Sequence, residues 1–182
     1  FNFRHWIDDL KIQGLFIAGK QGEFFSMSVD ERKRCFEIAV SEAGYKCQTI
    51  MSCSDQNFDT VLELSKYAED IGADYIVVHA PILNFVNDRK QILINYYTEL
   101  SSKVNIGIAM WSHPDSGYLM EPELCNEIAK LENIVAIKYS VPREMYKRLS
   151  ELASDKMIVS TASEKEWYDN IVELNWKLYL CS

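Results

Sequence analysis

Short apolar runs alternate with longer amphipathic segments along most of the chain. The apolar runs are nearly continuous, as in strands buried on both faces, and the segments between them are long enough to be the helices that connect parallel strands. This pattern predicts strands at residues 14–19, 46–53, 74–81, 105–114, 133–140, 156–163 and 177–182. It predicts helices at residues 3–13, 28–44, 57–72, 88–103, 121–132, 142–154 and 164–175.

Local signals mark several of the expected helix ends. Ser28 stands three residues before Glu31, which is the spacing of a capping box at a helix start. Gly44 and Gly72 stand where helices commonly stop, and Pro122 stands near the start of the helix at 121–132.

Two α/β architectures fit this alternation: an open doubly wound sheet and a (β/α)8 TIM barrel. The strand–helix unit repeats every ~25–30 residues, and no GxGxxG or Walker motif follows the first strand, so the barrel is favoured. A series that begins with a helix and ends on a strand predicts a barrel lacking its first strand and its C-terminal helices. We therefore expect residues 1–182 to form a single barrel domain, truncated at both ends.

Composition and charge exclude several classes of partner. The net charge is −8, which repels a phosphate backbone, so nucleic acid is not an expected partner. No apolar run is long enough to span a membrane, and no signal-peptide pattern is present. The five cysteines show neither CxxC nor zinc-ligand spacing, so we expect no metal and a reducing, cytoplasmic location.

The strand at 133–140 ends on a lysine. Ile134 to Ile137 are apolar and run straight into Lys138. In a barrel the active site lies at the carboxyl ends of the strands, and alternation places Ile134, Ala136 and Lys138 on one face. A buried amine tends to lose its proton and can then attack a carbonyl carbon to form a Schiff base. The competing interpretation is a lysine that reaches the rim and forms a structural ion pair.

Four segments of the chain resemble the dihydrodipicolinate synthase / N-acetylneuraminate lyase family of class I, lysine-dependent aldolases. Residues 14–34 are similar to its G-x-x-G-T-T-G-E segment and the following L-S-x-x-E-R, and residues 72–81 to its G-A-D strand ending in proline. Residues 110–114 occupy the place of its Y-N-x-P, and residues 131–140 are similar to P-N-I-x-G-I-K-D-S. The order and spacing agree across essentially the whole chain.

The resemblance implies a TIM barrel whose Schiff-base lysine is Lys138. It implies a small 2-oxo acid such as pyruvate as substrate, no metal or organic cofactor, and a homo-oligomer, either a dimer or a tetramer. It also implies that Gly19 and the two residues after it lie against the substrate carboxylate.

The chain departs from the family at the residues that handle the carboxylate and the protons. Lys20 and Gln21 replace the paired threonines, where Lys20 can supply charge and Gln21 a hydrogen-bond donor. Trp111 replaces the tyrosine of Y-N-x-P, and its indole N–H donates but does not titrate, so Trp111 cannot relay protons. Ile82 and Leu83 replace the aromatic pair that the family carries after the proline of the strand at 74–81, so the family's second tyrosine is also absent.

Other polar residues at strand ends are candidates for the missing function. His113 and His79 suit proton transfer near neutral pH, although a histidine at a strand end is also a common structural donor. Thr161 and Ser182 are candidates for lining the substrate pocket or for plain rim positions. Two hypotheses follow: an atypical aldolase or lyase with Lys138, Trp111 and His113 in its catalytic site, or a catalytically impaired barrel that binds a 2-oxo acid as a sensor or structural protein.

Overall fold

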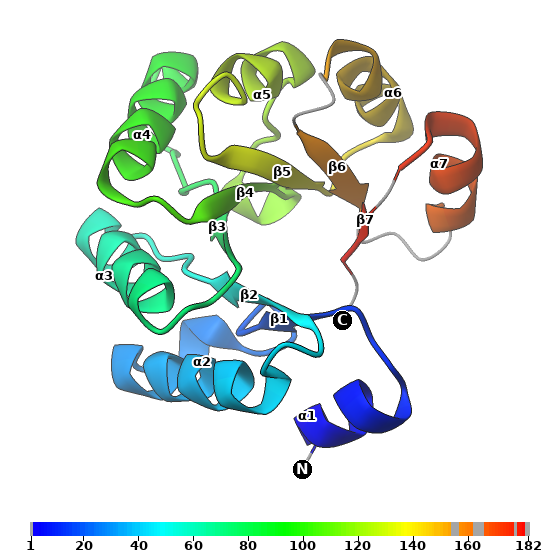
Figure 1. Cartoon of the computed structure of the whole chain (residues 1–182). Coiled ribbons are helices and arrows are strands. Elements are labelled where there is room, and N and C mark those ends of the chain that lie inside the picture. The colour runs from blue at the N-terminus through cyan, green and yellow to red at the C-terminus, as the bar shows by residue number, and fades with distance from the viewer. Residues whose placement is uncertain (1, 154–156, 162–165, 177, 181–182) are drawn as a thin grey trace. The chain divides into compact units, whose positions relative to one another are not determined.

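The computed structural model describes residues 2–153, 157–161, 166–176 and 178–180. Contacts within the chain group it into two compact units, Phe1–Val78 (unit 1) and His79–Ser182 (unit 2). Both units are built from strands alternating with helices, as Figure 1 shows by the change of colour along the chain.

Unit 1 contains three parallel strands with their connecting helices. Its elements are the helix α1 (Asn2–Arg4), the π-helical turn η1 (His5–Asp9), β1 (Gly14–Ile17), the 3-10 turn η2 (Phe24–Ser26), α2 (Val29–Ala43), β2 (Gln48–Ser52), α3 (Phe58–Asp70) and β3 (Tyr75–His79), the last residue of which begins unit 2. Leu15 pairs with Thr49 between β1 and β2, and Met51 pairs with Ile76 between β2 and β3. The strands are therefore neighbours in chain order.

Unit 2 continues the same alternation. Its elements are α4 (Arg89–Lys103), β4 (Gly107–Ser112), the 3-10 turn η3 (Pro114–Ser116), α5 (Pro122–Ile128), β5 (Ile134–Tyr139), α6 (Arg143–Leu152), β6 (Ile158–Thr161), α7 (Trp167–Leu174) and β7 (Leu178–Tyr179). The pairs β4–β5, β5–β6 and β6–β7 are all parallel, again in chain order. A doubly wound sheet reverses its strand order at a switch point, and neither unit shows such a reversal.

All seven predicted strands and the helices between them are present in the described part of the chain. Where both predicted ends are described, the observed bounds are shorter than the apolar pattern suggested, whereas the segments expected at 142–154, 156–163, 164–175 and 177–182 lie partly outside the described residues. The strand expected at 105–114 is Gly107–Ser112, and the helix expected at 121–132 is Pro122–Ile128. The chain leaves α5 through tighter turns, in which Lys130 N–H donates to Glu127 O at 3.3 Å and Leu131 N–H donates to Ile128 O at 3.1 Å. Ile106 and Ala129, directly outside these ends, are buried, so the apolar pattern continues past the regular element.

The first helix differs from the prediction of one continuous helix at 3–13. Regular α-helix covers only Asn2–Arg4 and is followed by the π-helical turn, in which Leu10 N–H donates to His5 O five residues back at 3.1 Å. Lys11 then adopts a positive φ of 54°, which takes the backbone out of the helical region. The prediction of a helix reaching residue 13 was wrong.

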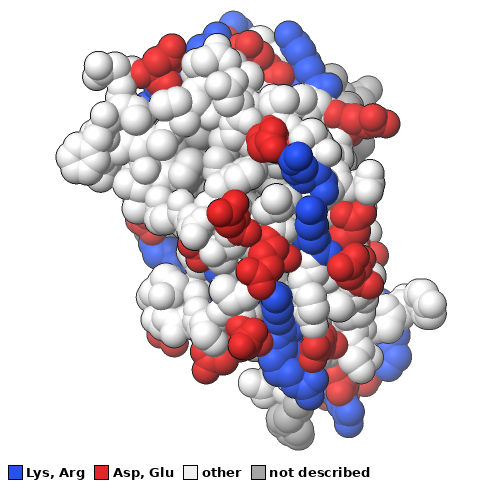
Figure 2. All heavy atoms as spheres, turned by 90° about the vertical axis from the view of Figure 1, so that its left-hand side faces the viewer, with Lys and Arg blue, Asp and Glu red and all other residues white. Residues whose placement is uncertain are grey.

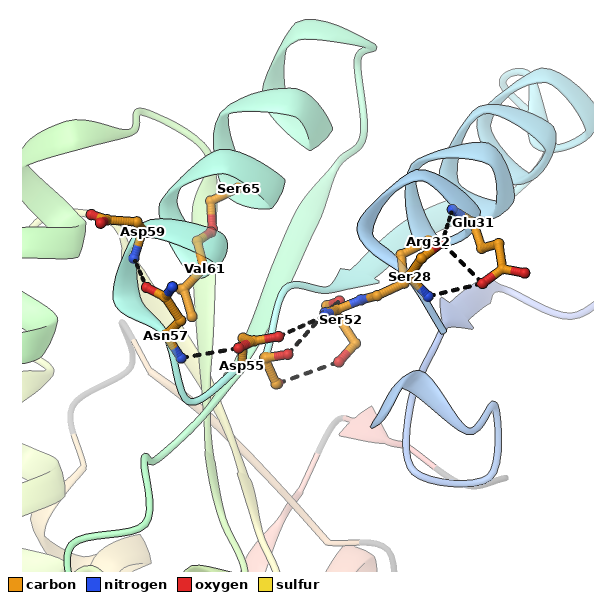
Figure 3. Close-up of polar contacts among 10 residues, drawn as sticks. Ser28, Glu31, Arg32, Ser52, Asp55, Asn57, Asp59, Val61 and Ser65 are labelled. Carbon is orange, nitrogen blue, oxygen red and sulfur yellow. Dashed lines mark hydrogen bonds and ion pairs between the residues drawn. The ribbon is translucent and has the colours of Figure 1, made fainter. Parts of the chain in front are cut away.

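A buried arginine ties the helix α2 to the end of β2 within unit 1. The predicted capping box is present: Ser28 Oγ accepts from Glu31 N–H at 3.2 Å, and Ser28 N–H donates to Glu31 Oε2 at 2.8 Å. One turn further along, Arg32 is 2% exposed and donates to Ser52 O at 2.8 Å and to Ser54 O at 2.9 Å (Figure 3). Its other terminal nitrogen lies 3.4 Å from Asp55. Arg32 therefore donates to two carbonyl groups at the end of β2.

The surface carries both signs of charge in close alternation. On the face drawn in Figure 2, blue lysine and arginine side chains are interleaved with red aspartate and glutamate side chains. Exposed pairs of this kind include Arg34 with Glu37 at 2.7 Å and Lys90 with Glu127 at 3.0 Å. Within the described part of the chain, no helix has both the length and the apolar character needed to cross a membrane.

Arg32 and Arg34 on the same helix give a matched test of the buried arginine. Arg32→Ala should lower the free energy of unfolding by about 3 kcal/mol, because two buried carbonyls lose their donors. Arg34, whose side chain is 69% exposed, makes only a surface ion pair, and Arg34→Ala should change stability by no more than about 0.5 kcal/mol. Urea unfolding followed by circular dichroism measures both values, and equal losses in the two variants would contradict the assigned role of Arg32.

Candidate active site

Lys138 lies near the carboxyl end of β5, and its cross-strand partner on β4 is Trp111. The register pairs Ile108 with Ile134 and then skips one residue, so that Ala109 pairs with Ala136 and Trp111 with Lys138. Without this bulge, each β4 residue after Ile108 would pair with the β5 residue one position earlier. Trp111 would then pair with Ile137 in place of Lys138. The irregularity therefore sets Trp111 and Lys138 side by side.

Lys138 is enclosed, and its ammonium nitrogen lies over the indole of Trp111. The residue is 3% exposed, Trp111 is 2% exposed, and Nζ stands 4.8 Å from the centre of the indole ring. A cation over such a ring gains about 0.5–2 kcal/mol, whereas burying an ammonium costs several kcal/mol. The free-energy cost of burying the ammonium is therefore larger than the gain from its contact with the indole. The prediction that Lys138 is a buried lysine at a strand end agrees with this geometry.

Tyr139, the residue after Lys138, belongs to the opposite face of β5. Its hydroxyl donates to Met120 O at 2.6 Å, and its ring packs edge-on against Tyr146 of α6 at 6.0 Å. Burial raises the pKa of Tyr139 far above its ordinary value, so this phenol stays protonated. Because its hydroxyl is directed to Met120 O on the face away from Lys138, Tyr139 does not occupy the place of a relay tyrosine beside the lysine.

Both candidate histidines gather around the same indole. The ring of His79, at the end of β3, packs edge-on against Trp111 with centroids 4.9 Å apart, and the ring of His113, directly after β4, lies 6.2 Å from it. The two imidazole rings are 6.3 Å apart. Unit 2 thus brings His79, Trp111, His113 and Lys138 into one cluster, as expected for residues at the carboxyl ends of neighbouring parallel strands.

Polar groups near the ends of β3 and β4 contact the two histidines. His79 Nδ1 lies 2.7 Å from Ala80 O, and Ser116 Oγ donates to the same carbonyl at 3.1 Å. His113 caps the turn η3, since its Nδ1 accepts from Asp115 N–H at 3.1 Å. Asp115 Oδ1 is 3.2 Å from that same nitrogen. Asp115 and Ser116 were not among the site residues predicted from the sequence, although Pro-Asp-Ser-Gly after a strand is a recognisable turn signal.

The predicted carboxylate-binding segment lies after β1, in unit 1. Gly19 is buried, whereas Lys20 and Gln21 are exposed, and Glu23 N–H closes the turn by donating to Lys20 O at 3.0 Å. A Cβ at Gly22 would lie 3.1 Å from Ala18 Cα, so the turn has little room for a side chain there. Glu23 makes these turn contacts through its backbone, and its side chain does not cap η2.

The cysteine that follows β2 is not a reactive nucleophile. Cys53, after β2, is fully buried, and this burial raises the pKa of its thiol to about 12, so at neutral pH it is an inert thiol. Within residues 2–153, 157–161, 166–176 and 178–180, no group of three or more His, Cys, Asp or Glu side chains could hold a metal ion. Thr161 ends β6 and pairs with Tyr179 in the backbone register, while Ser182 lies outside the described residues.

Comparisons with known proteins identify the family of this chain. The model of the dihydrodipicolinate synthetase family matches residues 2–175. N-acetylneuraminate lyase of Clostridium perfringens (strain SM101 / Type A) is 31% identical over 163 residues, which are 88% of this chain and 56% of that protein. The chain therefore spans about half the length of this curated relative.

Solved structures give the fold. The crystal structure of dihydrodipicolinate synthase from Aquifex aeolicus matches with a TM-score of 0.90 and 20% identity, over 98% of this chain and 61% of that one. A prophage protein of the dihydrodipicolinic acid synthase family from E. coli K12, in complex with pyruvate, matches with a TM-score of 0.88 and 23% identity, over 96% and 61% of the two chains. These relatives are (β/α)8 barrels, so the α/β fold is of the TIM-barrel class. The chain belongs to the dihydrodipicolinate synthetase family, a family of lyases and synthases.

Proposed function

We propose that this chain carries the Schiff-base centre of a class I aldolase or lyase acting on pyruvate or another 2-oxo acid. The observation that carries the proposal is Lys138 itself, enclosed at the carboxyl end of β5 and paired with Trp111 where the family has its relay tyrosine. Membership in a family of lyases and synthases supports it, as does the pyruvate named with the solved E. coli relative.

The proposed first step needs only the amine and the 2-oxo acid. The lone pair of Lys138 Nζ forms a bond to the C2 carbonyl carbon, and the carbonyl oxygen leaves as water with the two amine protons, which leaves a C=N bond. Protonated at nitrogen, this imine withdraws electrons from the neighbouring carbon C3, so that a bond at C3 can be formed or broken. No metal or organic cofactor enters these steps.

The other predicted site residues take supporting roles in this proposal. Gly19, Lys20 and Gln21 offer backbone N–H groups, a positive charge and an amide donor to the substrate carboxylate. Trp111 forms an apolar wall beside Lys138 and can donate one hydrogen bond, while Thr161 and Ser182 are proposed to line the pocket. His113 and His79 supply the titratable groups that the indole lacks, and His113 belongs to the catalytic site.

The complete activity is proposed for a longer chain. Because this sequence spans 56% of its curated relative and 61% of the solved ones, we propose that a first strand and C-terminal helices complete a single barrel domain around residues 1–182. A cytoplasmic location is part of the same proposal, and it is supported by the four described cysteines, Cys35, Cys47, Cys53 and Cys125, all of which are free thiols.

Reductive trapping tests the Schiff base directly. Borohydride added with pyruvate, or with a larger 2-oxo acid, should label Lys138 irreversibly, because reduction of the C=N bond fixes the adduct on Nζ. Intact-mass spectrometry and peptide mapping locate the label. Lys138→Ala should abolish labelling, whereas Lys130→Ala, at an exposed position after α5, should leave it unchanged. The absence of an adduct with every member of a 2-oxo acid panel would leave the alternative function: an impaired barrel that binds such an acid as a sensor or structural protein.

The activities of the named relatives should be very weak in this protein. General acid–base help is worth about 10²–10⁴-fold, and an indole at position 111 cannot provide the proton transfer that a phenol provides. Cleavage of sialic acid, and condensation of pyruvate with aspartate semialdehyde, should be slower than in the relatives by that order unless His113 or His79 takes over the proton transfer. Trp111→Tyr should recover part of the deficit. Robust turnover of either substrate by the unaltered protein would show that the role of Trp111 has been misassigned.

The family resemblance also leads us to propose a homo-oligomer, either a dimer or a dimer-based tetramer. Exposed apolar side chains such as Phe25, Phe85 and Tyr168 are compatible with contact between copies. Sedimentation velocity at micromolar concentration should therefore show a species larger than one chain. A single monomeric boundary over the whole concentration range would remove this part of the proposal.

A further inference from the structure

The backbone of one residue, Met120, is bonded by side chains from the ends of both β4 and β5. Ser112 Oγ accepts from Met120 N–H at 3.0 Å, and the hydroxyl of Tyr139 donates to Met120 O at 2.6 Å. Ser112 ends β4, Tyr139 ends β5, and the two are cross-strand partners in the register. Met120 therefore joins the two strand ends through its N–H on one side and its carbonyl on the other.

These two side chains lie directly behind the candidate catalytic pair. The register pairs Trp111 with Lys138 and, one residue further along, Ser112 with Tyr139. Successive side chains of a strand point to opposite faces. The side chains of Ser112 and Tyr139 therefore leave the strands on the face opposite to Trp111 and Lys138. Ser140 N–H donates to Ser112 O at 3.0 Å, which extends the backbone pairing past this point.

Burial makes the hydrogen bonds to Met120 costly to lose. Ser112, Met120 and Tyr139 are all almost fully buried, and a buried polar group that loses its partner costs about 1–3 kcal/mol. Cys125 Sγ donates weakly to Met120 O as well, at 3.8 Å. Burial raises the pKa of the Cys125 thiol above its ordinary range, so the donor keeps its proton. Hydrogen-bonded groups in such surroundings hold one another in a single arrangement.

The loop that ends at Met120 is also held near its middle. Ser116 Oγ donates to Ala80 O at 3.1 Å, and the hydroxyl of Tyr118 donates to Pro81 O at 2.7 Å. Both acceptors belong to the segment directly after β3. The loop is therefore held in two places, and Met120 is the place at which it is held to β4 and β5.

A glycine fixes the course of this loop between its two attachments. Gly117 closes the turn at residues 113–117 with φ +80°, and its N–H donates to Pro114 O at 2.9 Å. A Cβ at Gly117 would lie 2.8 Å from Asn84 Oδ1, so a larger residue would displace the loop. The chain thus reaches Met120 along a path that the turn already determines.

We infer that Tyr139 and Ser112 are positioning residues for the Schiff-base lysine, and that both act through the backbone of Met120. This inference rests on the proposed Schiff base at Lys138. The side chains of Lys138 and Tyr139 leave neighbouring Cα atoms in opposite directions, so anchoring the phenol fixes the rotation of β5 about its own axis at Lys138. Ser112 fixes β4 at Trp111 in the same way. Neither side chain contacts the substrate in this role.

The quantity that this positioning controls is the rate of imine formation. Attack by Nζ requires the nitrogen to lie about 3–3.5 Å from the carbonyl carbon, and a misplacement of about 1 Å can slow such a step by about 10²-fold. Binding of the substrate carboxylate is proposed for Gly19, Lys20 and Gln21, which do not take part in the bonds to Met120. Loss of these bonds should therefore lower the rate at saturating substrate and leave the half-saturating concentration nearly unchanged.

Timed quenching with borohydride measures both quantities in the full-length protein. The protein is mixed with pyruvate for a set time, borohydride is added, and intact-mass spectrometry gives the labelled fraction. Tyr139→Phe removes only the hydroxyl and keeps the ring that packs against Tyr146. It should form the imine about 10–10²-fold more slowly at saturating pyruvate, with a half-saturating concentration changed by less than about two-fold. Its final labelled fraction should equal that of the wild type.

A second variant tests whether the two side chains act through the same residue. Ser112→Ala removes the acceptor for Met120 N–H and should slow imine formation in the same manner. Residues that share a partner have non-additive effects. The variant with both changes should therefore be slowed by about as much as the slower single variant, and by much less than the product of the two fold-changes.

Two variants in unit 1 match these changes in chemistry. Tyr67→Phe removes a hydroxyl that donates to Glu37 on a neighbouring helix. Ser65→Ala removes a fully buried hydroxyl that donates to Val61 O at 2.6 Å within α3. Both should keep the wild-type rate of imine formation. Circular dichroism and urea unfolding measure the fold and the stability of every variant.

The outcomes separate the inference from the proposed function. Slower imine formation in Tyr139→Phe, with the final labelled fraction of the wild type, supports the positioning role. A wild-type rate in Tyr139→Phe, whatever its stability, shows a purely structural role and overturns the inference while the Schiff base stands. Fold-changes that multiply in the variant with both changes overturn the shared action through Met120. Failure of the wild type to form any adduct overturns the proposed function, and the positioning role with it.

Discussion

The register between β4 and β5 is the constraint on which the candidate site depends. The strands begin in step at Ile108 and Ile134, and one skipped residue then sets Trp111 opposite Lys138. Side chains alternate along a strand, so a displacement by one residue would pair Lys138 with a residue of the opposite face. The site is thus specified by backbone pairing several residues below it, in a layer of apolar side chains that are almost entirely buried. Substitutions in that layer could change the pairing of Trp111 with Lys138 without replacing either residue.

Much of the fold could be predicted because the interactions that form its elements involve residues close together in the sequence. Parallel strands buried on both faces need continuous apolar runs, and Ile76, Val77 and Val78 of β3 are all fully buried. The capping box at Ser28 was readable because its two hydrogen bonds lie within four residues. Element ends were less predictable, since buried residues such as Ile106 and Ala129 extend the apolar pattern beyond the regular element. The π-helical turn after Arg4 has no sequence signature comparable to a cap.

The candidate site was only partly predictable. Lys138 could be singled out because an ionisable group at the end of an apolar strand is costly and therefore informative. The strand-end histidines followed from the barrel architecture, but their polar contacts did not. Those include Ala80 O and the N–H of Asp115, and backbone groups cannot be identified as partners from the residue types alone. The exposure of Lys20 and Gln21 likewise reflects how the turn after β1 leaves its strand, which composition does not encode.

The candidate site combines residues from packed strands with residues from loops such as the turn at residues 113–117. Lys138 belongs to a strand whose neighbours are packed on both sides, where few residue types fit. The polar groups beside the two imidazoles, Ala80 O and the turn at residues 113–117, lie instead outside the strands. Loops tolerate change far better than cores. Substitutions in these loops can therefore accumulate faster than substitutions beside Lys138. The polar surroundings of the two histidines could change in this way while the strands that carry Trp111 and Lys138 stayed as they were.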